Sequence, residues 1–136
     1  MEDVIDELRE RAEGVPTPLR LPDDDELTSI EEELLIPLPG DLREFLLQVS
    51  DIIVGSLEPV TVTDCQAHTY LPEVAAEAWA AGIPRYLIPI CQDGLNYYCI
   101  SEDGQISLWI ENEESDQVWS SIWQWAKEIW LGGVDN

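Results

Sequence analysis

Hydrophobic residues recur every three to four positions through residues 1–50, which is the spacing of amphipathic helices. The first run, Glu2 to Ala12, predicts a helix. A second helix is expected to begin after Asp23, which with Glu26 fits a helix-capping box, and to end at Pro37. A third is expected after Pro39. Its apolar positions all match the helical template: Leu42, Phe45, Leu46 and Val49.

The pattern changes in the middle of the chain. Residues 15–22 are rich in proline and predict an extended connector between the first two helices. Between Ile52 and Thr63 β-branched residues accumulate, and the alternation at 60–63 predicts a strand with one face in water. Leu71 to Gly82 returns to helical spacing, with a proline near the first turn and a glycine at the end.

The C-terminal half begins with short runs of strand-forming residues. Asp93-Gly94 and Asp103-Gly104 separate them and are strong hairpin signals, so an antiparallel meander is expected. Its strands are predicted over Tyr86–Cys91, Tyr97–Ile100 and Gln105–Ile110. We interpret Asn112–Asp116 as an acidic loop. Ser121 and Gln124 form a second capping box for a terminal helix that runs to Leu131.

The order of these elements is helices, a strand, a helix, a meander and a helix. It contains no β-α-β alternation, so a parallel sheet is not expected. The sequence of 136 residues therefore predicts a single α+β domain, with a mainly antiparallel sheet and flanking helices at both termini.

Charge narrows the range of partners. The formal net charge is -23, and such an excess of carboxylates repels phosphate backbones and anionic lipid surfaces. Arg85 is the only Lys or Arg between Glu44 and Ala126, a stretch that holds thirteen carboxylates. We therefore expect no direct binding to nucleic acid or membranes, and a surface that attracts a basic protein.

The residues that could carry chemistry are few. Cys65, Cys91 and Cys99 lack CxxC spacing, so reduced thiols are expected, with no metal and no cofactor. The sequence shows neither a signal-peptide pattern nor a long apolar run, which predicts a cytoplasmic protein. His68 is the only histidine and follows Cys65 by three residues, which leaves a small hydrolase as one hypothesis. A surface histidine near a buried thiol is the alternative.

Two further patterns have both a structural and a functional interpretation. The acidic run from Asp23 to Glu26 lacks the glycine and the distal Glu of an EF-hand loop, so helix capping is expected there instead of calcium binding. Trp125 falls on the apolar stripe of the terminal helix. Most of the tryptophans are expected in the core, but Trp123 points away from this stripe, and Trp119 and Trp123 are the candidates for an exposed contact surface.

Two segments resemble a known family. Leu34 to Ser50, LLIPLPGDLREFLLQVS, is similar to the segment that opens SUKH domains, a superfamily of bacterial immunity proteins that includes a yeast cell-wall synthesis regulator. Leu71 to Trp109 resembles the family's order of Gly-Ile-Pro, Ile-Pro-Ile, a turn, Tyr-Tyr-Cys-Ile, Asp-Gly and a strand ending in Trp. Leu95 and Ser101 depart from the family pattern, and Leu95 in particular removes the freedom of a glycine from the turn.

The resemblance implies a non-enzymatic protein that neutralises a cognate toxin. An acidic face formed by the meander and adjoining loops is expected to dock on a basic toxin and to block its active site. The residues nominated for this partner surface are Asp93, Asn96, Tyr98, Glu102, Asp103, Glu111, Glu113, Glu114, Asp116 and Trp119, with Trp119 as the anchor. An intracellular regulatory or scaffold protein that binds an endogenous partner is the alternative function.

Overall fold

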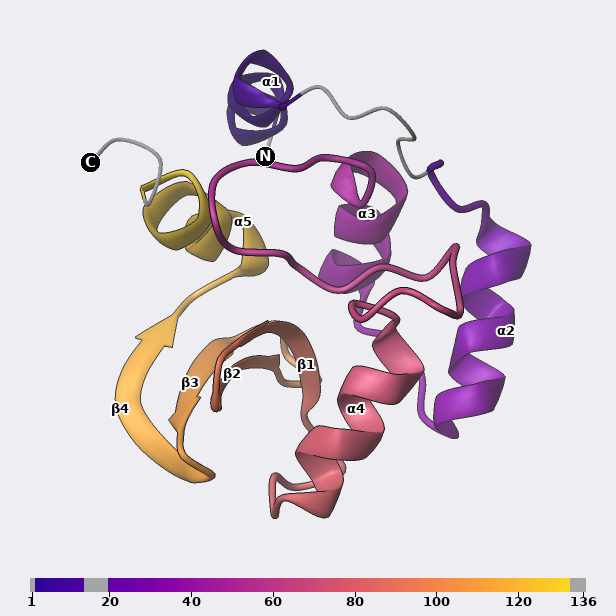
Figure 1. The fold of residues 1–136 in the computed structure, drawn as a ribbon, viewed down its shortest axis with the longest axis vertical. Coiled ribbons are helices and arrows are strands. Elements are labelled where there is room, and N and C mark those ends of the chain that lie inside the picture. Colours follow the sequence, from indigo (N-terminus) through magenta and orange to yellow (C-terminus); the bar gives the residue numbers. More distant parts are fainter. Residues whose placement is uncertain (1, 14–19, 133–136) are drawn as a thin grey trace.

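Helices lie above and to one side of a curved, four-stranded antiparallel sheet from the C-terminal half (Figure 1). This arrangement is seen in a computed structural model that describes residues 2–13 and 20–132. α4 lies beside β1, while α3 and α5 lie above the sheet with α1 across the top (Figure 1). The predicted α+β class is confirmed.

The first three helices form where hydrophobic spacing predicts them. They are α1 (Glu2–Arg11), α2 (Asp24–Leu34) and α3 (Gly40–Val49). The predicted capping box is present at α2, because the Asp23 carboxylate accepts the Glu26 amide and the Glu26 carboxylate accepts the Asp23 amide. α2 ends earlier than Pro37, at Leu34, and the C-cap residue Leu35 adopts a left-handed conformation with φ 66°. Most of the proline-rich connector lies outside the described residues.

Residues 52–70 form an irregular loop, so the strand expected from the alternation at 60–63 is wrong. Only isolated bridges occur there, from Pro59 to Cys91 of β1 and from Thr61 to Tyr70. The segment cannot keep one wet face, because Val60, Thr61 and Val62 are all buried. The chain then enters α4 (Leu71–Ala80), as predicted.

The sheet follows chain order β1-β2-β3-β4, with β1 at Ile88–Asp93, β2 at Asn96–Ile100 and β3 at Ile106–Ile110. The three predicted strands are confirmed, with every end within two residues of its expected position. Gly94 has a positive φ of 63°, whereas the φ of Leu95 is not positive. The leucine therefore sits at a turn position that does not need glycine, and this departure from the family pattern introduces no strain.

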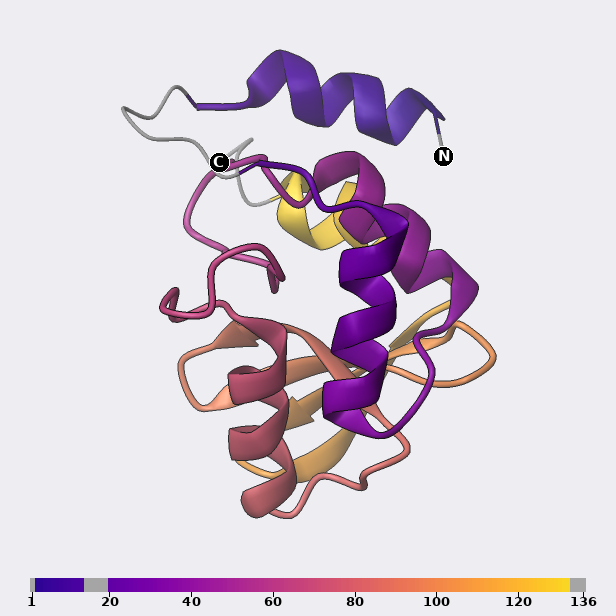
Figure 2. The ribbon, with the colours of Figure 1, turned by 90° about the vertical axis from the view of Figure 1, so that its right-hand side faces the viewer.

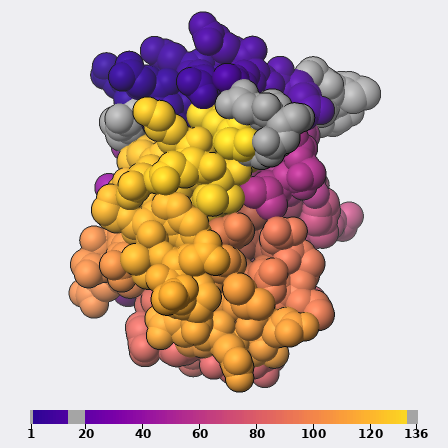
Figure 3. Space-filling view, turned by 90° about the vertical axis from the view of Figure 1, so that its left-hand side faces the viewer, coloured from indigo at the N-terminus to yellow at the C-terminus, as the bar shows by residue number. Residues whose placement is uncertain are grey.

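β4 (Glu113–Trp119) occupies most of the segment that we interpreted as an acidic loop, and that interpretation is wrong. Glu111 and Asn112 have φ values of 50° and 73°, which gives a two-residue primed turn without glycine. β4 is the edge strand and mostly faces water, so it lacks the alternation of apolar and polar residues by which strands are recognised. Figure 3 looks onto this strand and shows its surface open below the C-terminal helix.

The terminal helix starts as predicted and then changes its winding. The Ser121 hydroxyl caps α5 (Ile122–Trp125) by accepting the Gln124 amide, but the Gln124 side chain bonds to Ser120 rather than completing the box. The chain continues as a π-helix, η1 (Ala126–Trp130). Residues five apart lie about 140° apart around an α-helix, and the wider π turn reduces this angle.

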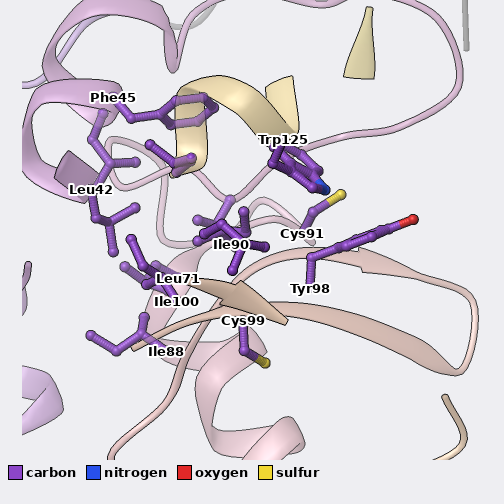
Figure 4. Packing of buried hydrophobic residues seen from close by; sticks show 14 of the residues in the cluster. Leu42, Phe45, Leu71, Ile88, Ile90, Cys91, Tyr98, Cys99, Ile100 and Trp125 are labelled. Atoms are coloured by element: carbon purple, nitrogen blue, oxygen red, sulfur yellow. The ribbon is translucent and has the colours of Figure 1, made fainter. Parts of the chain in front are cut away.

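The π turn allows two tryptophans five residues apart to join the same aromatic core. Trp125 and Trp130 stack with ring centroids 6.4 Å apart, and Phe45 of α3 lies 6.5 and 5.8 Å from them. The Trp130 indole also donates to the Val54 carbonyl at 3.1 Å. Figure 4 shows Phe45 and Trp125 directed into the space above Ile90. This core joins α3, the C-terminal helix and the sheet.

Candidate functional site

The nominated acidic residues lie at opposite ends of the sheet. The turns β1–β2 and β3–β4 meet at one end, and the β2–β3 turn lies at the other, about 16 Å away for a five-residue strand such as β2. We call the first the two-turn end: Asp93, Asn96, Glu111, Glu113 and Glu114. The second is the single-turn end: Asp41, Glu102 and Asp103. The single continuous acidic face that the sequence led us to expect is therefore divided in two.

The two-turn end is held by Asn96. Its side-chain oxygen accepts the backbone amide of Glu111 at 3.2 Å, which connects the first residue of β2 to the β3–β4 turn. Asp93 pairs with Asn96 across β1 and β2, so the two neighbouring turns form one rigid acidic edge. Asp93, Glu111, Glu113 and Glu114 are exposed. Asp116 is exposed too, in a bulge of β4 between the two ends.

The single-turn end joins the β2–β3 turn to the start of α3 (Figure 2). A Cβ atom added at Gly104 would lie 3.1 Å from Oδ2 of Asp41, so the two elements are in close contact. The Asp103 carboxylate accepts the Ser101 hydroxyl and the Gln105 amide. These hydrogen bonds, above all the one from Ser101, lower the pKa of Asp103, so its charge is fixed near neutral pH.

Three aromatic residues that we expected at the surface are buried instead. Tyr98, Trp119 and Trp123 are each only 8% exposed. Tyr98 lies between Trp119 and Trp125, with ring centroids 5.6 and 5.3 Å away, and Trp123 packs on Phe45 at 5.5 Å. Their role is in the core, and Trp119 cannot act as an exposed anchor. Burial also raises the pKa of the Tyr98 hydroxyl.

An apolar hollow lies beside the single-turn end and was not predicted from the sequence. It has a volume of about 330 Å³ and borders a more polar hollow of about 650 Å³, and both contain Tyr86 and Glu102 in their walls. Tyr86 is 72% exposed. We expected Tyr86 to be the first residue of a strand, but β1 begins at Ile88 and leaves this side chain free to face water.

The neighbourhood of His68 is polar and open. Its Nε2 lies 2.8 Å from Oε2 of Glu58, and both side chains line a hollow of about 280 Å³ with Ser56 and Gln92. Cys65 is exposed and does not line this hollow. In the part of the chain that the structure describes, no hydrogen bond joins the thiol to the imidazole. The arrangement of a thiol nucleophile activated by a histidine base is therefore not formed.

Among residues 2–13 and 20–132, no group of three or more His, Cys, Asp or Glu side chains could hold a metal ion. Asp23 is engaged as the cap of α2, as expected for the acidic run that it begins. In the same residues, no helix has the length and apolar character needed to cross a membrane.

Comparison with known proteins gives the family. The model of the SUKH_5 family, described as SMI1-KNR4 cell-wall, matches residues 1–131. The chain belongs to this SMI1-KNR4 family. Membership confirms the resemblance to SUKH domains seen in the sequence. No curated protein matches the chain.

A solved structure carries the same fold as this SMI1-KNR4 family member. It is described as the crystal structure of a protein from Pseudomonas syringae pv. tomato. The two sequences are 57% identical, and the match covers 97% of this chain and 99% of the other with a TM-score of 0.95. At this similarity the backbone that forms the two acidic ends is shared by both proteins.

Proposed function

We propose that this SMI1-KNR4 family member is a non-enzymatic immunity protein that binds a basic toxin with its acidic sheet ends and blocks the toxin's active site. The observation that supports this most is the separation of charge. Arg9, Arg20 and Arg43 form ion pairs in the helical part of the molecule, with Asp51, Glu26, and the pair Asp24 and Glu31 respectively. Within the described residues, no ion pair joins the carboxylates of the two acidic ends to a base.

Unpaired carboxylates on a rigid sheet suit recognition of a cationic surface. Acids already paired with Arg have little attraction left for a partner, whereas those at the two sheet ends form no ion pair within the described residues. Their field raises the rate of encounter with a basic protein and opposes binding to other acidic proteins. Toxins that act on nucleic acids carry basic surfaces because they must bind phosphate groups.

Stoichiometric titration tests this proposal directly. The toxin that the proposal expects to be encoded beside this gene is held at constant concentration while the purified protein is added in steps. A blocking protein reduces toxin activity linearly and abolishes it at one equivalent, without dependence on incubation time. A protein that modified the toxin catalytically would abolish activity at far less than one equivalent and more completely with time. Absence of any inhibition would contradict the immunity role.

A second candidate is an intracellular regulatory or scaffold protein that binds an endogenous partner. The reference to the cell wall in the family description favours it. Gene deletions separate the two candidates. If the protein acts only in immunity, cells that lack both its gene and the neighbouring toxin gene grow normally. If it regulates an endogenous partner, the double deletion retains a growth or envelope defect.

A further inference from the structure

The apolar hollow beside the single-turn end is built from segments far apart in the sequence. The loop between α2 and α3 forms one wall, and the segment that precedes β1 forms the other. Its lining residues are Ile36, Pro37, Leu38, Pro39, Tyr86, Ile88 and Glu102. We infer that this hollow and its polar neighbour form one groove, which binds a segment of the partner protein carrying an apolar side chain next to Lys or Arg.

Exposed apolar side chains mark the groove as a contact surface. Tyr86 stands in the walls of both hollows and is 72% exposed, and Leu35, which precedes the loop wall, is 79% exposed. Leu35 also holds a left-handed conformation that is costly for a residue with a Cβ atom. An exposed aromatic over an apolar floor is the usual centre of a protein-binding site.

The walls of the groove are held in place before binding. Glu31 accepts the Leu38 amide at 2.7 Å through one carboxylate oxygen and the Arg43 guanidinium at 2.9 Å through the other. On the opposite wall, the Trp79 indole donates to the Leu87 carbonyl at 2.8 Å. Because these contacts already order the backbone, a ligand loses little free energy to ordering the groove.

Charge identifies the occupant. Glu102 belongs to both hollows, Asp103 lines the second, and none of the described residues that line them is basic. Arg85, although next to Tyr86, stacks on Trp79 at 4.6 Å and lines a different hollow. A second copy of this chain, with a net charge of -23, would be repelled, as would a nucleic acid. A basic polypeptide segment fits both the apolar floor and the acidic rim.

The identity of the protein that supplies this segment rests on the proposed function, in which the partner is a basic toxin. The groove itself is tested with short synthetic peptides, which avoids the need for the toxin. The probe is a blocked pentapeptide of sequence Lys-Leu-Arg-Ile-Lys. One control peptide has Ser in place of Leu and Ile, and a second has Glu in place of Lys and Arg. Binding is followed by amide chemical shifts of the 15N-labelled protein.

The expected result is that only the first peptide binds, with amide shifts concentrated at Ile36, Leu38, residues 86–88 and residues 101–105, since the two prolines of the loop wall have no amide proton. Tyr86→Ala and Glu102→Gln should each weaken binding about tenfold or more. Leu95→Ala and Glu73→Gln are the matched controls, because Leu95 is 70% exposed, Glu73 is an exposed acid of α4, and neither residue lines the two hollows. These controls should leave the affinity unchanged.

Other results overturn the inference. Equal binding of the Ser-containing peptide, with shifts spread over both acidic ends, would show that net charge alone attracts the peptide. Absence of binding by the first peptide would also exclude the groove. Toxin inhibition that survives Tyr86→Ala and Glu102→Gln would reject the groove while the immunity function stands. Peptide binding in the groove without toxin inhibition would reject immunity and leave the groove.

Discussion

The Glu31 carboxylate accepts the backbone amide of Leu38 at 2.7 Å, and in this way a side chain of α2 fixes the loop that leads into α3. The same carboxylate accepts Arg43 from α3 at 2.9 Å. Glu31 is half-buried, so both contacts lie in a region where a lost hydrogen bond is not fully replaced by water. It therefore determines the shape of one groove wall.

Replacement of Glu31 by Ala is expected to lower the free energy of unfolding by about 1–3 kcal/mol, because the Leu38 amide and Arg43 lose their acceptor. Glu32→Ala is the matched control, since Glu32 is exposed in the same helix, and it should change stability by less than about 0.5 kcal/mol. Urea denaturation of both variants measures the difference. Equal stability of the two variants would contradict the role assigned to Glu31.

Leu35→Gly is expected to stabilise the protein by about 0.5–1 kcal/mol. The left-handed conformation at φ 66° costs a leucine about 1–2 kcal/mol, and only part of this gain is lost to the greater flexibility of glycine in the unfolded chain. Leu95→Gly makes the same chemical change at a similarly exposed position without positive φ and should destabilise the protein. Thermal denaturation that shows the same sign for both variants would refute this account.

Elements that depend on local signals could be predicted from the sequence, whereas those that depend on the surrounding structure could not. The capping box of Asp23 and Glu26, the spacing in α3 and the Asp-Gly turns are local signals, and they gave the correct elements. Leu35 has no local signal, because a leucine at positive φ is held there by surrounding structure. β4 was missed because an edge strand in water need not alternate apolar and polar residues.

The candidate site shows the same division. All of the nominated carboxylates are exposed as expected, since an acid without a partner remains in water. Tyr98 and Trp119 were misplaced because the side of a strand or helix that faces the core is decided by tertiary packing. The groove was not visible in the sequence at all. It joins residues 36–39 to Tyr86 and Glu102, which only the folded chain brings together.

The three cysteines are expected to differ in reactivity. Burial raises the pKa of Cys91 and of Cys99 to about 12, whereas Cys65 is exposed. Because the thiolate is the reactive form, iodoacetamide at a pH of about 8 should label Cys65 alone in the native protein and all three thiols in guanidinium. Intact mass measures the number of labels. Native Cys65→Ser should take up none, and rapid labelling of that variant would contradict the burial of the other two.

Acid should weaken the contribution of the Glu26 charge to stability. The hydrogen bond from Arg20 lowers the pKa of Glu26, so the folded state binds this proton less readily than the unfolded state. The stabilisation is therefore complete above the ordinary glutamate pKa and is lost as the pH falls through the lowered value. Glu26→Gln keeps an acceptor for the helix cap but removes the charge. Denaturation at several pH values should show a deficit near neutral pH that vanishes in acid, and a pH-independent deficit would contradict this.

The most direct test of the central claim is calorimetric titration of the purified protein with the basic toxin that the proposed function expects to be encoded beside its gene, at about 50 mM and about 300 mM NaCl. The account predicts a one-to-one complex whose affinity falls with salt, because exposed carboxylates at the two sheet ends supply the attraction. Glu113→Lys and Glu102→Lys should each weaken the complex and reduce its salt dependence. A tight complex that is insensitive to salt and to both substitutions, or no complex at all, would contradict the account.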